Sequence, residues 1–300
     1  MQNIKHFFKL FSVAAATSVA ITAVLTACQP VAKPAATLQL QLLWQGKPWL
    51  CGQTIQLGTQ AMQLDTLQLY LSQFRQTEPV LLRQSEHSSE QAVLLGVDCR
   101  DANASATAQW AIPLDKPLNS GPLHFTLGLP EALNHQNPLT ASAVFQAPDM
   151  HWNWQFGYKF FRLDLAPVAS STAPAWSFHL GSTGCESPSV MRAPAAPCQA
   201  PNRVEVTLNY QAGQQLTLDV APLLQGITPS SDNSCMADRQ VQSCQLLLGR
   251  LGLYAAGQPA TLFASATEQT AATPTTAVKS TSNNSSAATG VPSGTKGLMR

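Results

Sequence analysis

Six cysteines constrain the fold of this chain more than any other feature, because each cross-link makes neighbours of two segments. Outside the N-terminal leader they are Cys51, Cys99, Cys185, Cys198, Cys235 and Cys244. An even number predicts disulfides in an oxidising compartment. Short loops close at the least entropic cost, so Cys185 is expected to pair with Cys198. By the same reasoning Cys235 pairs with Cys244, which leaves Cys51 for Cys99. A structural zinc site is the alternative, but the chain has no C-x-x-C pair.

The N-terminus has the pattern of a secretory leader. Lys5 and Lys9 precede an apolar run at residues 11–25, which is short for a membrane span. The run ends in Leu25-Thr26-Ala27-Cys28, which resembles the lipobox of bacterial lipoproteins, with Cys28 as the acylated first residue. An ordinary cleavage site beside a chance cysteine is the alternative. Because the next residue is not Asp, the same resemblance implies an outer-membrane lipoprotein of the cell envelope, facing the periplasm or the cell surface, held by several acyl chains.

Alternating apolar and polar residues predict strands along most of the chain. The clearest segments are residues 38–42, 64–71, 93–97, 123–129, 204–208 and 216–220. Helical signals are weak, with one turn expected at 130–133 and a short helix at 241–251. The sequence therefore predicts a mostly β, disulfide-stapled, β-sandwich-like single domain with long loops.

Composition sets the expected boundaries and excludes one class of partner. We expect a lipoprotein signal peptide at 1–27, a tether at 28–36, the folded domain at 37–256 and a disordered Ser/Thr/Ala-rich tail at 257–300. Charged residues make up only 11% of the chain and the net charge is +1. A protein with so little positive charge lacks the electrostatic footprint of nucleic-acid binding.

Two tryptophans near the middle of the chain are the most distinctive aromatic feature. If the segment is an extended strand, Trp152 and Trp154 project side by side from one face. Such a pair is either a packed aromatic wall of the core or a redox-active surface. Met150 and His151 adjoin the pair and are residue types that bind soft metals.

The sequence contains no signature of a common enzyme. It lacks H-E-x-x-H and G-x-S-x-G, and it lacks the C-x-x-C-H motif that attaches c-type haem. We therefore do not expect an enzyme. The histidines that follow the leader are His87, His124, His135, His151 and His179. Taken singly, each is more often a hydrogen-bonded structural residue than a ligand, although imidazoles suit copper or zinc.

Several motifs, in order, carry a resemblance to a known family. The segment at 152–160, Trp-Asn-Trp-Gln-Phe-Gly-Tyr-Lys-Phe, resembles the W-x-W-Q-x-G-Y-K-F signature of the MbnP-like family, also called metallo-mystery-pair four-Cys-motif proteins. Further matches are Asn134-His135, the segment from Phe178-His179 to Gly184-Cys185, Pro201-Asn202-Arg203, and the pair Cys235 and Cys244. The resemblance spans residues 38–255, and ordered motifs are far more specific than any single one.

The resemblance implies a copper-binding protein that works with a dihaem, cytochrome c peroxidase or MauG-like partner. In that family the partner oxidises a tryptophan to kynurenine, which turns an indole into an aromatic amine and a ketone. The resemblance makes His135 and His179 the leading copper-ligand candidates, with His151 a third. Candidates for oxidation are Trp154, Trp152 and Trp176.

Two other functions remain open at this point. A binding or interaction lipoprotein of the cell envelope without a metal would use the tryptophans to contact a ligand or partner. A periplasmic hydrolase would need a nucleophile that the sequence does not display.

Overall fold

The computed structural model describes residues 36–101, 108–169, 172–254 and 261–266. All of these residues belong to one compact unit. The expected signal peptide, the acylated Cys28, nearly all of the tether and residues 267–300 of the expected tail lie outside the described residues. Among the described residues, no helix is long and apolar enough to span a membrane.

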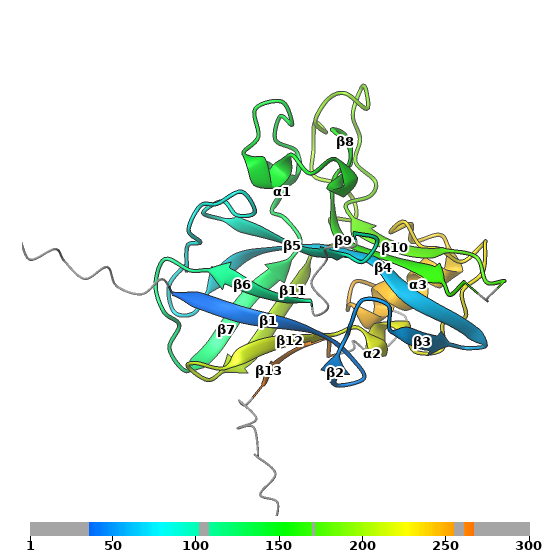
Figure 1. The fold of residues 1–300 in the computed structure, drawn as a ribbon. Helices are drawn as coiled ribbons and strands as arrows, with labels where there is room; N and C mark the ends of the chain where they lie inside the picture. Colours follow the sequence, from blue (N-terminus) through cyan, green and yellow to red (C-terminus); the bar gives the residue numbers. More distant parts are fainter. Residues whose placement is uncertain (1–35, 102–107, 170–171, 255–260, 267–300) are drawn as a thin grey trace, which may run out of the picture. The chain divides into compact units, whose positions relative to one another are not determined.

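Strands make up most of the regular structure in the described part of the chain (Figure 1). In chain order the elements are β1 (Thr37–Trp44), β2 (Lys47–Pro48), β3 (Thr54–Leu57), β4 (Gln60–Arg75), β5 (Ala92–Asp98), β6 (Gln109–Pro113), β7 (Gly121–Leu127), α1 (Glu131–Asn134), η1 (Ala143–Phe145), η2 (Pro148–Met150), β8 (His151–Asn153), β9 (Gly157–Pro167), β10 (Trp176–Gly181), β11 (Val204–Tyr210), β12 (Gln215–Asp219), α2 (Ala221–Leu224), α3 (Gln242–Arg250) and β13 (Phe263–Ala266). The strands expected from alternation, the turn after Pro130 and the short helix near residue 241 are confirmed.

The strands form two sheets. The smaller sheet has the order β13-β12-β1-β2, with β6 also paired to β1. Its β1 and β12 are parallel, whereas its other pairs are antiparallel. The larger sheet has the order β10-β9-β4-β7-β11 and is antiparallel, with β3 and β5 added to β4 and β8 added to β9. The long strand β4 is the hub of this sheet.

The core lies between the sheets and explains the alternation in the sequence. Leu38, Leu40 and Leu42 of β1 are buried, as the period of two requires. Phe125 on β7 meets Phe263 on β13 edge to face at 5.1 Å, which joins the larger sheet to the smaller one. The mostly β, two-sheet fold is therefore confirmed.

All three expected disulfides are present. Cys51 is bonded to Cys99, Cys185 to Cys198 and Cys235 to Cys244. Cys235 and Cys244 are fully buried. Their bond connects α3 to the edge strand β10 of the larger sheet, because Cys235 forms a backbone β-bridge with Phe178 of β10. The loop-closure argument thus selected the correct pairs.

Two expectations are wrong. The disordered tail was placed at 257–300, but Phe263–Ala266 forms β13 and pairs with β12. Leu262 and Phe263 are both buried, and this single apolar pair is outweighed in the composition by the small and polar residues that follow it. The tryptophan segment is also not one extended strand. It is a hairpin in which β8 ends at Asn153 and a turn carries Trp154, so the two tryptophans do not share a strand face.

Replacing Phe263→Ala is expected to lower the free energy of unfolding by about 3 kcal/mol, because an aromatic ring between the sheets is lost. Chemical denaturation monitored by circular dichroism measures the change. Ala264→Ser, at an exposed position of the same strand, serves as the control and should change stability by no more than about 0.5 kcal/mol. Equal stability of the two variants would mean that β13 is not part of the cooperative unit.

Candidate metal centre

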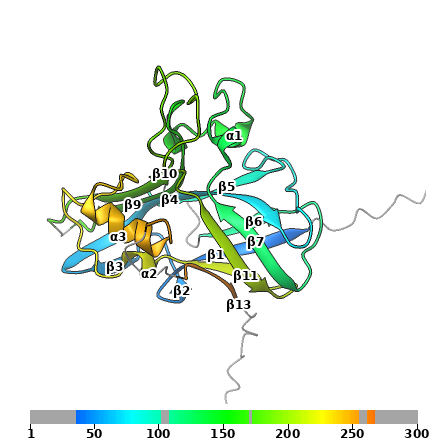
Figure 2. The same ribbon diagram turned by 180° about the vertical axis from the view of Figure 1, so that it is seen from behind.

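Three segments that are distant in sequence project together from one end of the molecule, as both views show (Figure 1, Figure 2). They are α1 with the residues that follow it, the β8–β9 hairpin, and the loop after β10. The side chain of Gln155 in the hairpin turn connects to this loop by donating a hydrogen bond to the carbonyl of Cys185 at 2.6 Å. Its backbone N–H donates to the carbonyl of Val190 at 3.3 Å. Most of the candidate residues lie in these segments.

Asn134, the last residue of α1, links all three segments. Only 2% of its surface is exposed. Its side-chain oxygen accepts a hydrogen bond from the Tyr158 backbone N–H at 2.8 Å, and its side-chain nitrogen donates to Ser182 Oγ at 3.3 Å. Gly157 allows this approach, because its φ of +75° is left-handed and an added Cβ would collide with Asn134. The amide is therefore a structural clamp at the base of the site.

The same amide sets the protonation of His135. Asn134 Nδ2 lies 3.0 Å from His135 Nε2, and because an amide nitrogen only donates, Nε2 must accept. The ring hydrogen is then on Nδ1, which points to the Trp154 carbonyl at 3.4 Å. Burial lowers the pKa of His135, and the hydrogen bond to Trp154 and the charge of Glu131 only partly oppose it. His135 is a neutral imidazole with its basic nitrogen directed into the site, which is the form that binds metals.

Trp154 is held against His135 by a reciprocal contact. Its indole Nε1 donates a hydrogen bond to the His135 carbonyl at 2.9 Å, while the His135 ring faces the Trp154 carbonyl. Trp154 is only partly buried, in contrast to Trp176, which is 1% exposed and donates to the Asn233 carbonyl. Trp152 is also partly buried, and its ring covers Gly181, where a Cβ would meet it. Of the three tryptophans, Trp154 alone bonds to a candidate ligand among the described residues.

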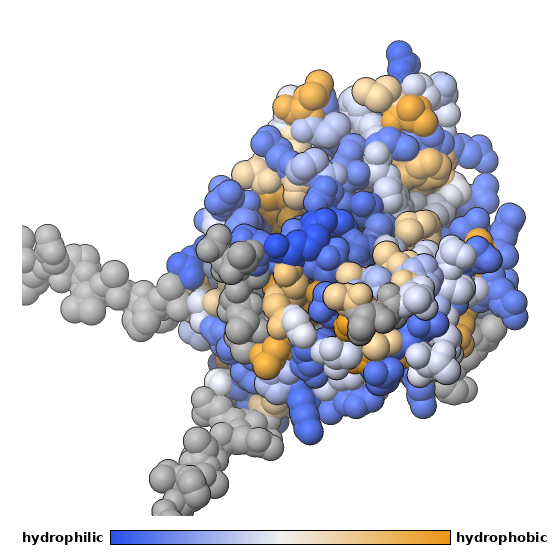
Figure 3. All heavy atoms as spheres, turned by 45° about the vertical axis from the view of Figure 1, so that its right-hand side comes forward, coloured by the Kyte–Doolittle hydropathy of each residue, from blue (hydrophilic) through white to orange (hydrophobic). Residues whose placement is uncertain are grey.

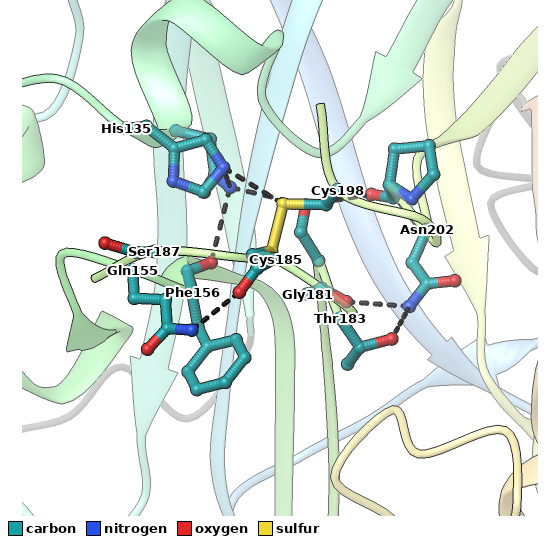
Figure 4. The surroundings of a disulfide bond; sticks show 12 residues. His135, Gln155, Phe156, Gly181, Thr183, Cys185, Ser187, Cys198 and Asn202 are labelled. Carbon is teal, nitrogen blue, oxygen red and sulfur yellow. Dashed lines mark hydrogen bonds between the residues drawn. A yellow bond between two sulfur atoms is a disulfide. The ribbon is translucent and has the colours of Figure 1, made fainter. Parts of the chain in front are cut away.

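A disulfide lies directly beside the imidazole (Figure 4). His135 Nε2 is 3.4 Å from Cys198 Sγ, and the ligand atoms of His135, Cys185 and Cys198 all lie within 4.8 Å of one another. Among the described residues, no other group of three His, Cys, Asp or Glu residues is as close. The two sulfurs are bonded to each other, however, and metals bind the thiolate form of cysteine. In the oxidised state His135 is the one donor of this trio.

His179 occupies a different environment, on the outer face of the larger sheet. Its Nε2 is 2.8 Å from Asp164 Oδ1, and Asp164 Oδ2 accepts from Arg162 Nε at 2.6 Å. Burial alone would raise the pKa of Asp164. The hydrogen bonds from His179 and Ser177 and the charges nearby outweigh that effect and hold this pKa well below its usual range. A carboxylate that orients an imidazole is also common behind metal-binding histidines.

His151 begins β8 and packs against the Tyr158 ring at 4.9 Å. Burial lowers the pKa of His151, which favours its neutral form. The nitrogens of His135, His151 and His179 do not converge within 4.8 Å as a set of three. The structure therefore brings His135 together with Trp154 and the Cys185–Cys198 disulfide, and it places His179 with Asp164. The ligand roles of the three histidines stay predictions.

Two asparagines are more important than the sequence suggested. In the sequence, Asn134 stands out only as the neighbour of His135, and Asn202 only as part of a motif. Asn202 is buried with a left-handed φ of +48°. Its side chain donates to the Gly181 carbonyl at 2.8 Å and accepts from Arg239 at 2.9 Å, which closes the loop that carries Cys198. Asparagine tolerates this backbone conformation better than most residues, which is the signal available in the sequence.

Replacing Asn134→Ala is expected to lower the free energy of unfolding by about 3 kcal/mol, because several buried partners lose their hydrogen bonds together. Urea denaturation measures this change. The control is Asn137→Ala, whose side chain accepts one hydrogen bond from the Leu139 backbone N–H in an exposed loop. A cost for Asn134→Ala no larger than that of the control would show that the three segments hold together without the clamp.

Asp164→Asn is expected to make the free energy of unfolding less dependent on pH in the acid range. An aspartate whose pKa is lowered on folding stabilises the protein above its unfolded pKa of about 4, and this contribution is lost as the pH falls through the folded value. Wild type should therefore lose stability below about pH 4 more steeply than the variant. Unfolding is measured between pH 7 and pH 2, with the exposed Asp115→Asn as the control. Parallel curves for wild type and Asp164→Asn would contradict the assignment.

Comparisons with known proteins agree with the motifs. The profile of the MbnP family matches residues 33–237. The solved structure of MbnP from Methylosinus trichosporium is similar in fold, with a TM-score of 0.61 and 22% sequence identity over 77% of this chain and 98% of that chain. A comparison with curated proteins gave no match. Because the family match covers more than half of the sequence, the chain belongs to the MbnP family.

Proposed function

We propose that this protein is a lipid-anchored copper-binding protein of the cell envelope, acting in copper homeostasis, whose Trp154 is oxidised to kynurenine by a dihaem, MauG-like partner. The observation that supports this function best is the pairing of Trp154 with a neutral imidazole. Each residue contacts the carbonyl of the other, and His135 presents a basic nitrogen to the site. Copper bound there would be held by nitrogen donors, which suit both of its common oxidation states.

The chemistry of kynurenine fits this position. Opening the indole of Trp154 would leave an aromatic amine at the site of the Nε1 atom, which lies beside His135. An amine and an imidazole in this contact would form the nucleus of a copper site. His179 on β10 and His151 on β8, two strands that each pair with β9, are the remaining candidates for further nitrogen ligands.

The surface around Trp154 favours contact with a partner protein. Leu139 and Met191 are 87% and 71% exposed, which makes them the most exposed large apolar residues in the described part of the chain. Val190, next to Met191 in the chain, is 50% exposed. Leu139 follows α1 and the other two lie in the loop after β10, so they flank the site on both sides. Figure 3 shows apolar groups at the projecting tips, separated by polar surface. Apolar residues in such an arrangement are typical of contact surfaces.

Co-expression with a dihaem partner tests the proposal. Wild type and Trp152→Phe and Trp176→Phe variants should show the mass change of kynurenine formation and bind copper, whereas Trp154→Phe should show neither. Intact-mass spectrometry and metal analysis of the same samples give both results, and the intact mass also reports acylation of Cys28. His135→Ala should keep the mass change but lose at least about tenfold in copper affinity, since it removes a ligand.

A second candidate function is an interaction lipoprotein without a metal, which the exposed apolar tips would also serve. In that case neither copper nor a modified tryptophan would be found in wild type after co-expression. His135→Ala would then leave partner binding unchanged, because the exposed apolar residues, and not the imidazole, would make the contact.

A further inference from the structure

We propose that reduction of the Cys185–Cys198 disulfide opens a second mode of metal binding, in which the two thiolates and His135 Nε2 hold one Cu(I) ion. The three ligand atoms already lie within 4.8 Å of one another. Two thiolates and an imidazole are a soft, low-coordinate donor set that matches Cu(I). This site does not require a modified tryptophan, so it goes beyond the function proposed above.

The imidazole is in position before any metal arrives. Its tautomer is fixed by the hydrogen bond that Nε2 accepts from Asn134 and by the contact between Nδ1 and the Trp154 carbonyl. Nε2 faces Cys198 Sγ at 3.4 Å. A metal ion would replace only the hydrogen bond from Asn134, whose links to Tyr158 and Ser182 remain. This clamp is independent of the disulfide.

The backbone keeps the two cysteines together when the bond between them is broken. The Cα atoms of Cys185 and Cys198 are 4.1 Å apart. Next to them, Thr183 and Ala200 exchange two backbone hydrogen bonds of 2.9 and 3.0 Å, and the Gln199 N–H donates to the Gly184 carbonyl at 3.1 Å. The loop is thus closed by a short ladder as well as by sulfur, and the thiols would stay within reach of one ion.

A small cavity gives access to one sulfur. A hollow of about 150 Å³ is lined by Cys198 and His135 together with Glu131, Ser182 and Arg203. Cys198 is 8% exposed and Cys185 is 3% exposed. Because thiol–disulfide exchange requires an approach to one sulfur, Cys198 is the expected point of attack. The Cys235–Cys244 bond is fully buried and is not part of any such ligand group in the described residues.

The redox step balances with a dithiol as the reductant. A thiolate of the dithiol attacks Cys198 Sγ, the bond to Cys185 breaks, and Cys185 leaves as a thiolate that takes up a proton. The second thiol of the reductant then attacks the mixed disulfide and frees Cys198 as a thiol. Two electrons and two protons pass to the protein, and the reductant becomes a disulfide. Binding of Cu(I) afterwards releases the thiol protons.

Anaerobic Cu(I) titration against a chromophoric chelator tests the site. The full chain is made without a dihaem partner, so that its tryptophans are unmodified, and is titrated before and after treatment with dithiothreitol and desalting. After the same reduction, wild type is expected to bind about one more Cu(I) per chain than the Cys185→Ser/Cys198→Ser variant. X-ray absorption should show sulfur and nitrogen neighbours of copper in the reduced sample. Circular dichroism checks that the fold is retained.

Two variants serve as matched controls. Cys185→Ser/Cys198→Ser keeps His135 and the other two disulfides and should lose the additional ion. His135→Ala keeps both thiols and should bind that ion at least about tenfold more weakly. The X-ray absorption result on wild type holds even if a variant fails to fold.

Three outcomes would overturn the assignment. The first is a disulfide that resists dithiothreitol while the protein stays folded. The second is a reduced wild type that takes up no more Cu(I) than the double-serine variant. The third is a His135→Ala variant that binds Cu(I) as tightly as wild type. Copper binding by the oxidised, kynurenine-containing protein is measured separately. A negative result for the thiol site therefore does not contradict the proposed function, and a negative result for the proposed function does not contradict the thiol site.

Discussion

The buried amide of Asn134 is the interaction on which the functional end of this protein depends. It joins α1, the β8–β9 hairpin and the loop after β10, and it does so with hydrogen bonds in a place that water does not reach. A buried polar group must find partners, so the amide forces three distant segments into one arrangement. The same group accounts for the glycine at position 157 and for the tautomer of His135. Stability and chemistry at this end therefore have a common origin.

The electronic character of the site depends on sulfur oxidation. With the Cys185–Cys198 bond intact, the trio offers a single imidazole donor, and the disulfide serves as a structural brace beside it. With the bond open, the same atoms become a soft donor set. Trp154 adds a second dependence, because oxidation of its indole would introduce a nitrogen donor next to His135. On both proposals, metal binding would depend on the oxidation state of these side chains as well as on the sequence.

The strands and the disulfide pairs could be predicted from the sequence, because their signals lie in short segments or in the spacing of the cysteines. Period-two alternation located β1, β4, β7 and the other long strands, because side chains of a strand alternate between core and solvent. Loop-closure entropy selected the three disulfides. Prediction from the sequence failed at β13, because Leu262 and Phe263 are an isolated apolar pair in a stretch of small and polar residues, and the partner Phe125 is far away in the chain. It failed again at Trp154, because two aromatic residues with a period of two suggested a strand where the chain turns.

The sequence by itself determined the two-sheet fold, the pairing of the cysteines and the family. Each of these follows from composition, from short-range periodicity or from ordered motifs that are visible along the chain. Only the tertiary structure decided which candidates meet. It placed Trp154 in contact with His135, and His135 beside the Cys185–Cys198 disulfide. It also paired His179 with Asp164, away from that disulfide. The physical reason is that these contacts join residues from separate loops and strands, whose distances are set by packing and buried hydrogen bonds that no local pattern encodes.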